Sequence, residues 1–415
     1  MKHLFLAVCG ILAMGSGLAE ERLAGLALVT VAKDGKIKIE TEGCAVYAAD
    51  GQTCQMPLTA QSVIRVASIS KLVVALGVMR LVEAGTLDLD RDVSDYLGWP
   101  LRNPSFPDAP ITLRMILSHT SSLRDGDYVM PLGTRVAEKL KEAQFWAADK
   151  GPVDRYFAYA NTGFVVVGTV MEAATGERFD RLMTRLVLEP LGLDAGYNWS
   201  GVSDAGIAKA AALYRTGDDA YDPAAAWVAQ TDDLKGVRPA CPVFRASVDD
   251  PCDLDSYVPG THGGLFGPQG GLRISPEGLA KIARLILGQG EVDGVRLLKT
   301  QTLAAMMSPY WVADGANGAV DGESASMCAY GISMQALNAS AASSCRDNVF
   351  GDGRVRWGHL AEAYGLFGGL WVDAEAGTAA IYLVTGTSSD PRDRPGTRSA
   401  FTALEEDLSV RLLSK

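Results

Sequence analysis

The chain has 415 residues, of which 48% are hydrophobic and 21% charged, and its formal net charge is −11. This composition is ordinary for a globular protein, and the length predicts two or three lobes rather than one core. The acidic balance argues against nucleic acid or an anionic membrane surface as a partner, because both bind through cationic faces. We therefore expect a small-molecule or cell-wall substrate.

The first 19 residues predict a signal peptide. Lys2 and His3 precede an apolar run at residues 4–14, and small residues follow up to Ala19, after which cleavage is expected. A membrane anchor is the alternative, but about 20 apolar residues are needed to cross a bilayer and this run is shorter. Lipidation of Cys9 is a further alternative, which the preceding valine disfavours. The prediction is a periplasmic or secreted protein with no membrane span after cleavage.

The other six cysteines fall into three pairs that are close in sequence: Cys44 with Cys54, Cys241 with Cys252, and Cys328 with Cys345. An even set in an exported chain is typical of disulfides, and six cysteines allow 15 connectivities. We favour the local pairs because each closes a short loop rich in Gly, Ala or Asp. A zinc site is the alternative, but the sequence has no CxxC spacing and its four histidines are scattered. No metal and no cofactor is expected.

In chain order, the mature sequence begins with two β-rich runs, at residues 27–33 and 36–40. Asp34-Gly35 between them suits a tight turn and predicts a hairpin. Residues 66–85 then predict a helix that ends in glycine and is buried, because it is apolar on most sides.

Helical patterns alternate with polar loops from residue 88 to 264, which predicts a helical domain. Within it, residues 218–260 are rich in Asp, Ala and Pro and are predicted to form a surface insertion clipped by Cys241 and Cys252.

After residue 264 the pattern returns to strands. Two helical segments, 276–287 and 300–307, precede strand-like runs at 329–334, 354–358, 364–372 and 379–385, and a closing helix carries Phe401, Leu404, Leu408 and Leu412 on one face. The prediction is an α+β fold. Its antiparallel sheet is built from residues 20–87 and 265–415 and flanked by helices, and the helical domain at 88–264 is inserted into it.

The first turn of the buried helix carries Ser68-Ile69-Ser70-Lys71. A serine hydroxyl becomes a good nucleophile only when a base takes its proton, and a base three residues later on a helix lies on the same face. Lys71 is such a base only if burial lowers its pKa. Chance also produces this spacing, and the alternative is a serine cap followed by a surface lysine.

Two further segments make the chain resemble the serine beta-lactamase-related family, which includes class C beta-lactamases, D,D-peptidases and certain esterases. Arg-Val-Ala-Ser-Ile-Ser-Lys at residues 65–71 looks like the family's nucleophile helix, and residues 112–123 look like its helix-and-turn signature. Tyr159-Ala160-Asn161 matches the YxN motif, 91 residues after Ser68. The resemblance spans nearly the whole mature chain and implies a beta-lactamase/transpeptidase-like fold.

By this resemblance, Tyr159 shares general-base and general-acid duty with Lys71. Asn161 donates its amide to the substrate's carbonyl and holds Lys71 in place. His119, in the turn signature, is expected to be structural rather than catalytic.

The third motif of the family departs from its pattern. Gly358-His359-Leu360-Ala361 stands where the family has GHxG, so that Ala361 replaces a glycine. The resemblance implies that His359 is a catalytic residue, which faces Tyr159 and supplies a neutral or partly positive hydrogen-bond donor. It also implies an oxyanion hole made by the backbone N–H groups of Ser68 and Glu362. Two other partial matches, Lys299-Thr300-Gln301 and His262-Gly263-Gly264, lie in the wrong place.

Relatives that bind a substrate carboxylate offer a hydroxyl where this chain has Leu360, and Glu362 adds a negative charge nearby. We therefore predict an esterase or amidase that acts through a Ser68 acyl-enzyme on a small ester, amide or cell-wall peptide. A D-alanyl-D-alanine carboxypeptidase or beta-lactamase activity is the alternative. Because Ala361 adds a methyl group at the third motif, a non-catalytic binding protein is another. The sequence indicates no oligomeric state.

Overall fold

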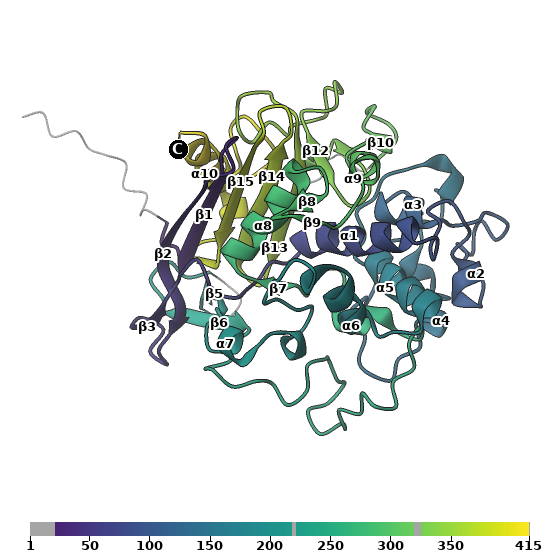
Figure 1. Ribbon diagram of the computed structural model, residues 1–415, viewed down its shortest axis with the longest axis horizontal. Coiled ribbons are helices and arrows are strands. Elements are labelled where there is room, and N and C mark those ends of the chain that lie inside the picture. Colours follow the sequence, from purple (N-terminus) through teal and green to yellow (C-terminus); the bar gives the residue numbers. More distant parts are fainter. Residues whose placement is uncertain (1–20, 218–220, 319–324, 415) are drawn as a thin grey trace, which may run out of the picture.

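The computed structural model describes residues 21–217, 221–318 and 325–414, so the predicted signal peptide lies outside the described residues. A twisted sheet occupies one side of the molecule and a group of helices the other (Figure 1). The sheet has nine antiparallel strands in the order β10 (Trp311–Val312), β11 (Ala329–Tyr330), β12 (Gln335–Leu337), β13 (Arg356–Ala363), β14 (Leu366–Asp373), β15 (Thr378–Val384), β1 (Gly25–Val31), β2 (Ile37–Tyr47) and β3 (Cys54–Pro57). The expected α+β fold is confirmed.

The two ends of the chain meet in the middle of this sheet. β1 pairs with β2 as the predicted hairpin, in which Val31 lies opposite Ile37 and Gly35 takes the positive φ of 82° that the turn requires. On its other edge β1 pairs with β15, with Val29 opposite Ile381. The middle of the sheet therefore forms only when residues more than 300 apart in sequence come together.

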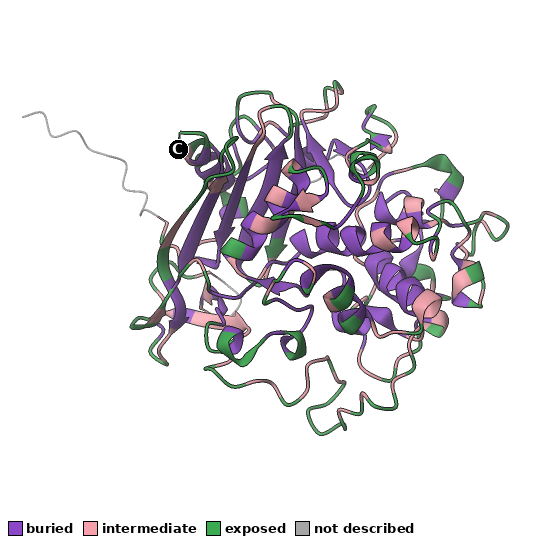
Figure 2. Ribbon diagram, viewed as in Figure 1, coloured by how far each residue is buried: buried purple, intermediate pink, exposed green. Residues whose placement is uncertain are grey.

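Both faces of the sheet are covered, because successive side chains of a strand point to opposite sides. Ala27 and Val29 pack in the core that contains α8 (Pro276–Leu287), whereas Leu26 and Leu28 pack with α10 (Ala403–Leu413). Colouring by burial shows the central strands buried along most of their length (Figure 2).

Helix α1 (Ile69–Glu83) lies between the sheet and helices α3 (Leu113–Leu117) and α5 (Thr162–Thr175) (Figure 1), and most of its residues are buried. It ends before Gly85, which has a φ of 73°, as the sequence predicts. It begins later than the predicted residue 66, because Ala67 leaves the helical conformation.

The segment after α1 contains mostly short helices. They are α2 (Ser94–Leu97), α3 (Leu113–Leu117), α4 (Val136–Lys139), α5 (Thr162–Thr175), α6 (Phe179–Met183) and α7 (Asp204–Ile207), and α9 (Thr300–Met306) follows α8 later in the chain. Helix α5 packs against α2, α3 and α6. Among the described residues, no helix is long and apolar enough to cross a membrane.

The segment also contains two short strands that the sequence did not predict, β5 (Leu213–Thr216) and β6 (Trp227–Thr231). They pair with each other, and β5 pairs with β16 (Gly386–Thr387) from the end of the chain. Elements this short carry too few residues for a clear alternating pattern.

The three predicted disulfides are confirmed. The Cα atoms are 5.7 Å apart in Cys44–Cys54 and 5.6 Å apart in both Cys241–Cys252 and Cys328–Cys345. The first links β2 to β3 at the edge of the sheet, and the second closes a loop within the predicted insertion.

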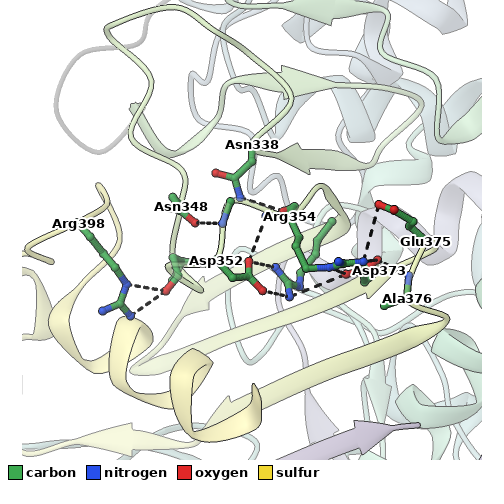
Figure 3. A network of polar contacts seen from close by, with 11 residues as sticks. Asn338, Asn348, Asp352, Arg354, Asp373, Glu375, Ala376 and Arg398 are labelled. Atoms are coloured by element: carbon green, nitrogen blue, oxygen red, sulfur yellow. Dashed lines mark hydrogen bonds and ion pairs between the residues drawn. The ribbon is translucent and has the colours of Figure 1, made fainter. Parts of the chain in front are cut away.

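Strand β13 is anchored at its start by a polar network (Figure 3). Arg356 makes two hydrogen bonds of 2.7 Å to the carboxylate of Asp352, and Arg354 binds Asp373 at the end of β14. The side chain of Asp373 is only 2% exposed, so the carboxylate of this ion pair is shielded from solvent, whereas Arg354 is 40% exposed. The network fixes the strand three residues before His359, which belongs to the site described next.

Candidate active site

Ser68 lies directly before α1 and directly after Ala67, a residue with a strained backbone conformation. The short strand β4 (Ile64–Arg65) pairs with β7 (Arg273–Ile274), and Ala67 then takes a φ of 42° before the helix begins. A positive φ is unfavourable for a residue with a side chain and is found where the surrounding structure imposes it, often at functional sites. The strained residue places the hydroxyl of Ser68 at the helix N-terminus, on the wall of a cavity.

Lys71 is fully buried one turn further on, so the alternative of a surface lysine is wrong. Its Nζ donates hydrogen bonds to Ser68 Oγ at 2.9 Å, to Asn161 Oδ1 at 2.8 Å and to the carbonyl oxygen of Gln269 at 2.7 Å. Burial lowers the pKa of Lys71 to about 7, because the charged ammonium loses its hydration. Near neutral pH a substantial fraction of Lys71 is therefore an unprotonated amine.

Tyr159 approaches the same serine from the loop before α5. Its hydroxyl donates to Ser68 Oγ at 2.9 Å, and Lys71 Nζ lies 4.9 Å from the centre of its ring. Burial raises the pKa of Tyr159 well above its usual value, so the phenol keeps its proton at neutral pH. Ser68, Lys71, Tyr159 and Asn161, all predicted as site residues, thus form one hydrogen-bonded cluster.

Asp125 belongs to this cluster although no sequence motif predicted it. Its carboxylate accepts hydrogen bonds of 2.8 Å from Asn161 Nδ2 and from the backbone N–H of Thr162. Its negative charge also raises the pKa of Lys71, against the larger effect of burial. A single aspartate in a polar loop matches no motif, so only the fold reveals it.

His119 supports the tyrosine and does not touch the nucleophile. Its Nδ1 accepts the backbone N–H of Ala160 at 3.1 Å, and its ring lies 4.3 Å from that of Tyr159 between centroids. Burial lowers the pKa of His119 well below its usual value, so the ring is neutral. This geometry fits the structural role expected for His119.

His359 lies on β13, and its ring centre is 6.0 Å from that of Tyr159. Burial and the charge of Lys71 lower its pKa to about 3, so the imidazole is neutral. Nδ1 lies 2.6 Å from the carbonyl oxygen of Leu360 and must carry the hydrogen, which leaves Nε2 to accept from the hydroxyl of Tyr330 at 2.7 Å. Both ring nitrogens of His359 are therefore engaged away from Ser68 and Tyr159, and the ring does not supply the donor that the resemblance implied. Tyr330 was not foreseen from the sequence.

Ala361 is 1% exposed and lies opposite Gly368 of the neighbouring strand. The absent side chain of Gly368 leaves room for its methyl group, because a Cβ added at Gly368 would be 3.5 Å from that of Ala361. Glu362, the next residue, lines the cavity, and its carboxylate is 3.7 Å from Nη1 of Arg392.

The cavity next to Ser68 has a volume of about 570 Å³. One part of its wall comes from the segment predicted as a surface insertion, which contributes Pro242, Val243 and Phe244 from inside the Cys241–Cys252 loop. The sequence did not indicate that this loop reaches the site. In the described parts of the chain, no group of three or more His, Cys, Asp or Glu side chains could hold a metal ion.

The other two partial matches to the third motif lie outside the cluster. His262 Nε2 lies 3.2 Å from the carbonyl oxygen of Met130, and the backbone N–H of Lys299 donates to Glu83 at the end of α1. Neither makes a hydrogen bond to Ser68, Lys71 or Tyr159.

Comparison with known proteins places this arrangement in a family. A family model described as Beta-lactamase matches residues 13–405, and the chain belongs to that family. Penicillin-binding protein 4 of Amycolatopsis lactamdurans is 26% identical over 254 residues, which cover 60% of this chain and 57% of that protein. Esterase EstB of Burkholderia gladioli is 31% identical over 200 residues, which cover 43% of this chain and 48% of EstB. The chain thus spans about half the length of these curated relatives.

Solved structures share the fold over a longer stretch. The D-amino acid amidase of Ochrobactrum anthropi SV3 superposes with a TM-score of 0.63 at 19% identity, over 94% of this chain and 93% of the amidase. A class C beta-lactamase of Rhodobacter sphaeroides gives a TM-score of 0.63 at 16% identity, over 94% of both chains. At these identities the likeness establishes the fold.

Proposed function

We propose that this protein is a serine hydrolase that cleaves esters or amides through an acyl-enzyme on Ser68. One observation carries the proposal: Ser68 Oγ lies 2.9 Å from both Lys71 Nζ and the hydroxyl of Tyr159, on the wall of a cavity. A nucleophile that contacts both a base with a lowered pKa and a protonated acid is equipped for acyl transfer.

In the proposed reaction, the neutral amine of Lys71 takes the proton of Ser68 as Oγ attacks the substrate's carbonyl carbon. The negative charge that develops on the carbonyl oxygen is stabilised by the N–H groups of Ser68 and Glu362. The proton then passes to the leaving group by way of the hydroxyl of Tyr159, and the acyl group stays on Ser68. Water releases it by the reverse proton transfers. Asn161 holds Lys71 and donates to the substrate, and His359 keeps Tyr330 and β13 in place.

The substrate class is supported by the names of the relatives. These include Esterase EstB, the D-alanyl-D-alanine-carboxypeptidase/endopeptidase AmpH of Escherichia coli and a D-amino acid amidase, which between them act on esters, peptides and amides. We propose a small ester, amide or cell-wall peptide as the substrate of this chain, with ester or amide hydrolysis favoured over beta-lactam hydrolysis.

Covalent labelling tests the proposal directly. A fluorophosphonate probe is expected to label the wild-type protein on Ser68 and to leave Ser68→Ala unlabelled, and only the wild type should hydrolyse p-nitrophenyl esters. Absence of labelling in the folded wild type would favour a non-catalytic binding protein. Rapid nitrocefin turnover with little ester hydrolysis would overturn the preference for esters and amides.

We also propose that the protein is exported and that residues 1–19 are removed. The three disulfides support this, because such bonds persist in oxidising compartments such as the periplasm or the cell exterior. N-terminal sequencing of the protein from the periplasmic and culture fractions should give Glu20 as the first residue. Recovery of the full-length chain from the cytoplasm alone would contradict the proposal.

A further inference from the structure

Three arginines line the catalytic cavity, and two of them are paired with carboxylates. Arg273 binds Asp232 through two hydrogen bonds, 3.0 Å from Nη2 to Oδ1 and 3.2 Å from Nε to Oδ2. Arg392 lies 2.6 Å from Asp390 and 3.7 Å from Glu362. Their charges are therefore compensated within the protein.

Arg65 differs from the other two. It lies on β4, three residues before the nucleophile, and its Nε donates to the carbonyl oxygen of Gly270 at 3.1 Å. Across residues 21–217, 221–318 and 325–414, this is the one hydrogen bond that its side chain makes, and it forms no ion pair. Burial lowers the pKa of Arg65 to about 10, which still leaves the guanidinium charged at neutral pH.

The nearby acid does not compensate Arg65. The charge of Asp232 acts on Arg65 and raises its pKa, but both oxygens of Asp232 already accept hydrogen bonds, from Arg273 and from the indole N–H of Trp199. Arg65 and Arg273 thus share a single carboxylate beside the cavity. A partly buried cation without its own anion is costly, and a bound anion would relieve that cost.

Two tyrosines add hydrogen-bond donors beside this cation. The guanidinium of Arg65 lies 4.9 Å from the ring centre of Tyr364, and its charge also acts on the phenol of Tyr128. Both tyrosines line the cavity, and within the described chain neither hydroxyl makes a hydrogen bond. Tyr364 lies in the two-residue turn between β13 and β14, where it has a φ of 57° and is followed by Gly365 with a φ of 88°.

We propose that Arg65, together with the hydroxyls of Tyr128 and Tyr364, forms a carboxylate-binding subsite of the catalytic cavity, and that the preferred substrate is an ester or amide that carries a carboxylate. The inference rests on the proposed function, since it assigns a substrate to the Ser68 site. The argument from Leu360 concerns a carboxylate bound on β13, whereas the anion proposed here is bound by a cation on β4, on the nucleophile's side of the cavity. Guanidinium groups suit this task because they offer several donors in a plane.

Matched pairs of substrates test the subsite. For a carboxylate on the acyl side, the p-nitrophenyl monoesters of succinic, glutaric and adipic acid are compared with their neutral methyl diesters. For the leaving-group side, 4-carboxyphenyl acetate is compared with its methyl ester. The wild type should have a higher kcat/KM for the acid in at least one pair. In Arg65→Gln the ratio of acid to neutral substrate should fall about 10- to 100-fold, the range expected for a charge-assisted hydrogen bond.

Two further variants control this result. Arg65→Lys keeps the charge and should retain part of the preference. Arg181→Gln, which removes an exposed cation of α6 outside the cavity, should retain the ratio of the wild type. Thermal melting and fluorophosphonate labelling report whether each variant is folded. A ratio that is the same in the wild type and in a folded Arg65→Gln protein would overturn the subsite while leaving the hydrolase intact.

A binding measurement separates failure of the subsite from failure of the proposed function. Calorimetry on Ser68→Ala measures the affinity for the monoanilides of succinic, glutaric and adipic acid and for their methyl esters, without any reaction. Tighter binding of the acid, lost in the double variant Ser68→Ala/Arg65→Gln, would support the subsite even if no ester were hydrolysed. Equal affinity for acid and methyl ester at all three lengths, together with no preference in the leaving-group pair, would overturn it.

Discussion

Lys71 is the residue on which the proposed chemistry depends most. Burial lowers its pKa to about 7, and only the neutral amine can accept the proton of Ser68. We therefore expect kcat/KM for a neutral p-nitrophenyl ester to rise with pH through an apparent pKa of about 7 and to level off about one unit above it. A pH profile measured under first-order conditions checks this. A rate that does not change between about pH 5.5 and 8.5 would show that Lys71 is not the titrating base.

Asp125 provides a second test of the same residue. Its carboxylate favours the protonated form of Lys71, so Asp125→Asn should lower the pKa of Lys71 and move the rising limb of the pH profile to more acidic values. The variant retains an oxygen that can accept from Asn161, as the carboxylate does at 2.8 Å. Asp127→Asn, an exposed residue of the same loop, is the matched control and should leave the limb in place. An unshifted limb in Asp125→Asn would mean that Asp125 acts only through hydrogen bonds.

At the scale of elements, the packing beside the third motif depends on Gly368, a small residue of β14 that lies opposite Ala361 of β13. A Cβ added at Gly368 would lie 3.0 Å from Leu383 Cδ2 and 3.1 Å from the carbonyl oxygen of Tyr382, both tighter than ordinary contact. Gly368→Ala should therefore lower the free energy of unfolding by about 1–3 kcal/mol. Urea denaturation measures this, and a stability equal to that of the wild type would contradict the tight packing of β14 against β15 at Gly368.

Ala361→Gly is the companion variant, because the methyl group of Ala361 is buried and has ordinary room beside Gly368. It should lower the free energy of unfolding by about 0.5–1 kcal/mol, the usual cost of glycine's backbone freedom. The rate at which a fluorophosphonate labels Ser68 should change little. A large gain in labelling rate would instead show that the alanine obstructs the site.

Local patterns were enough to predict several elements and the centre of the site. The hairpin at Gly35, the buried helix and the cluster of Ser68, Lys71 and Tyr159 each follow from residues close in sequence or from a family motif. The start of α1 could not be predicted, because the positive φ of Ala67 is imposed by the β4–β7 pair, which joins segments about 200 residues apart.

The remaining contacts of the site were not predictable for the same reason. Asp125, the carbonyl of Gln269 and the hydroxyl of Tyr330 reach the cluster from three distant segments, and none belongs to a periodic pattern. Long-range contacts of single polar atoms leave no trace in local composition, and they become visible only when the fold brings the segments together.

For the molecule as a whole, the cavity joins the nucleophile helix, strand β13 and the loop closed by Cys241–Cys252. Residues 257–260, at the end of the predicted insertion, are hydrogen-bonded to Glu172, a buried side chain of α5. Its Oε2 accepts from the hydroxyl of Tyr257 at 2.5 Å and from the backbone N–H of Gly260 at 2.9 Å. One cavity wall therefore belongs to a segment whose C-terminal end is hydrogen-bonded to a carboxyl group outside the catalytic cluster.

These hydrogen bonds predict a pH effect on residues 241–260. Burial raises the pKa of Glu172 from 4.5 to about 7, and the carboxylate of Asp180 acts in the same direction. The folded state thus binds the proton more tightly than the unfolded state, so this contribution to stability is complete below about pH 4.5 and is lost as pH rises through 7.

Hydrogen exchange of residues 241–260, corrected for intrinsic rates, should show less protection at pH 8 than at pH 5. Glu172→Gln, which stays neutral, should remove the difference, whereas the exposed Glu189→Gln should preserve it. Equal pH dependence in the wild type and Glu172→Gln would show that the segment is held by other contacts, with the Cys241–Cys252 disulfide as the next to remove.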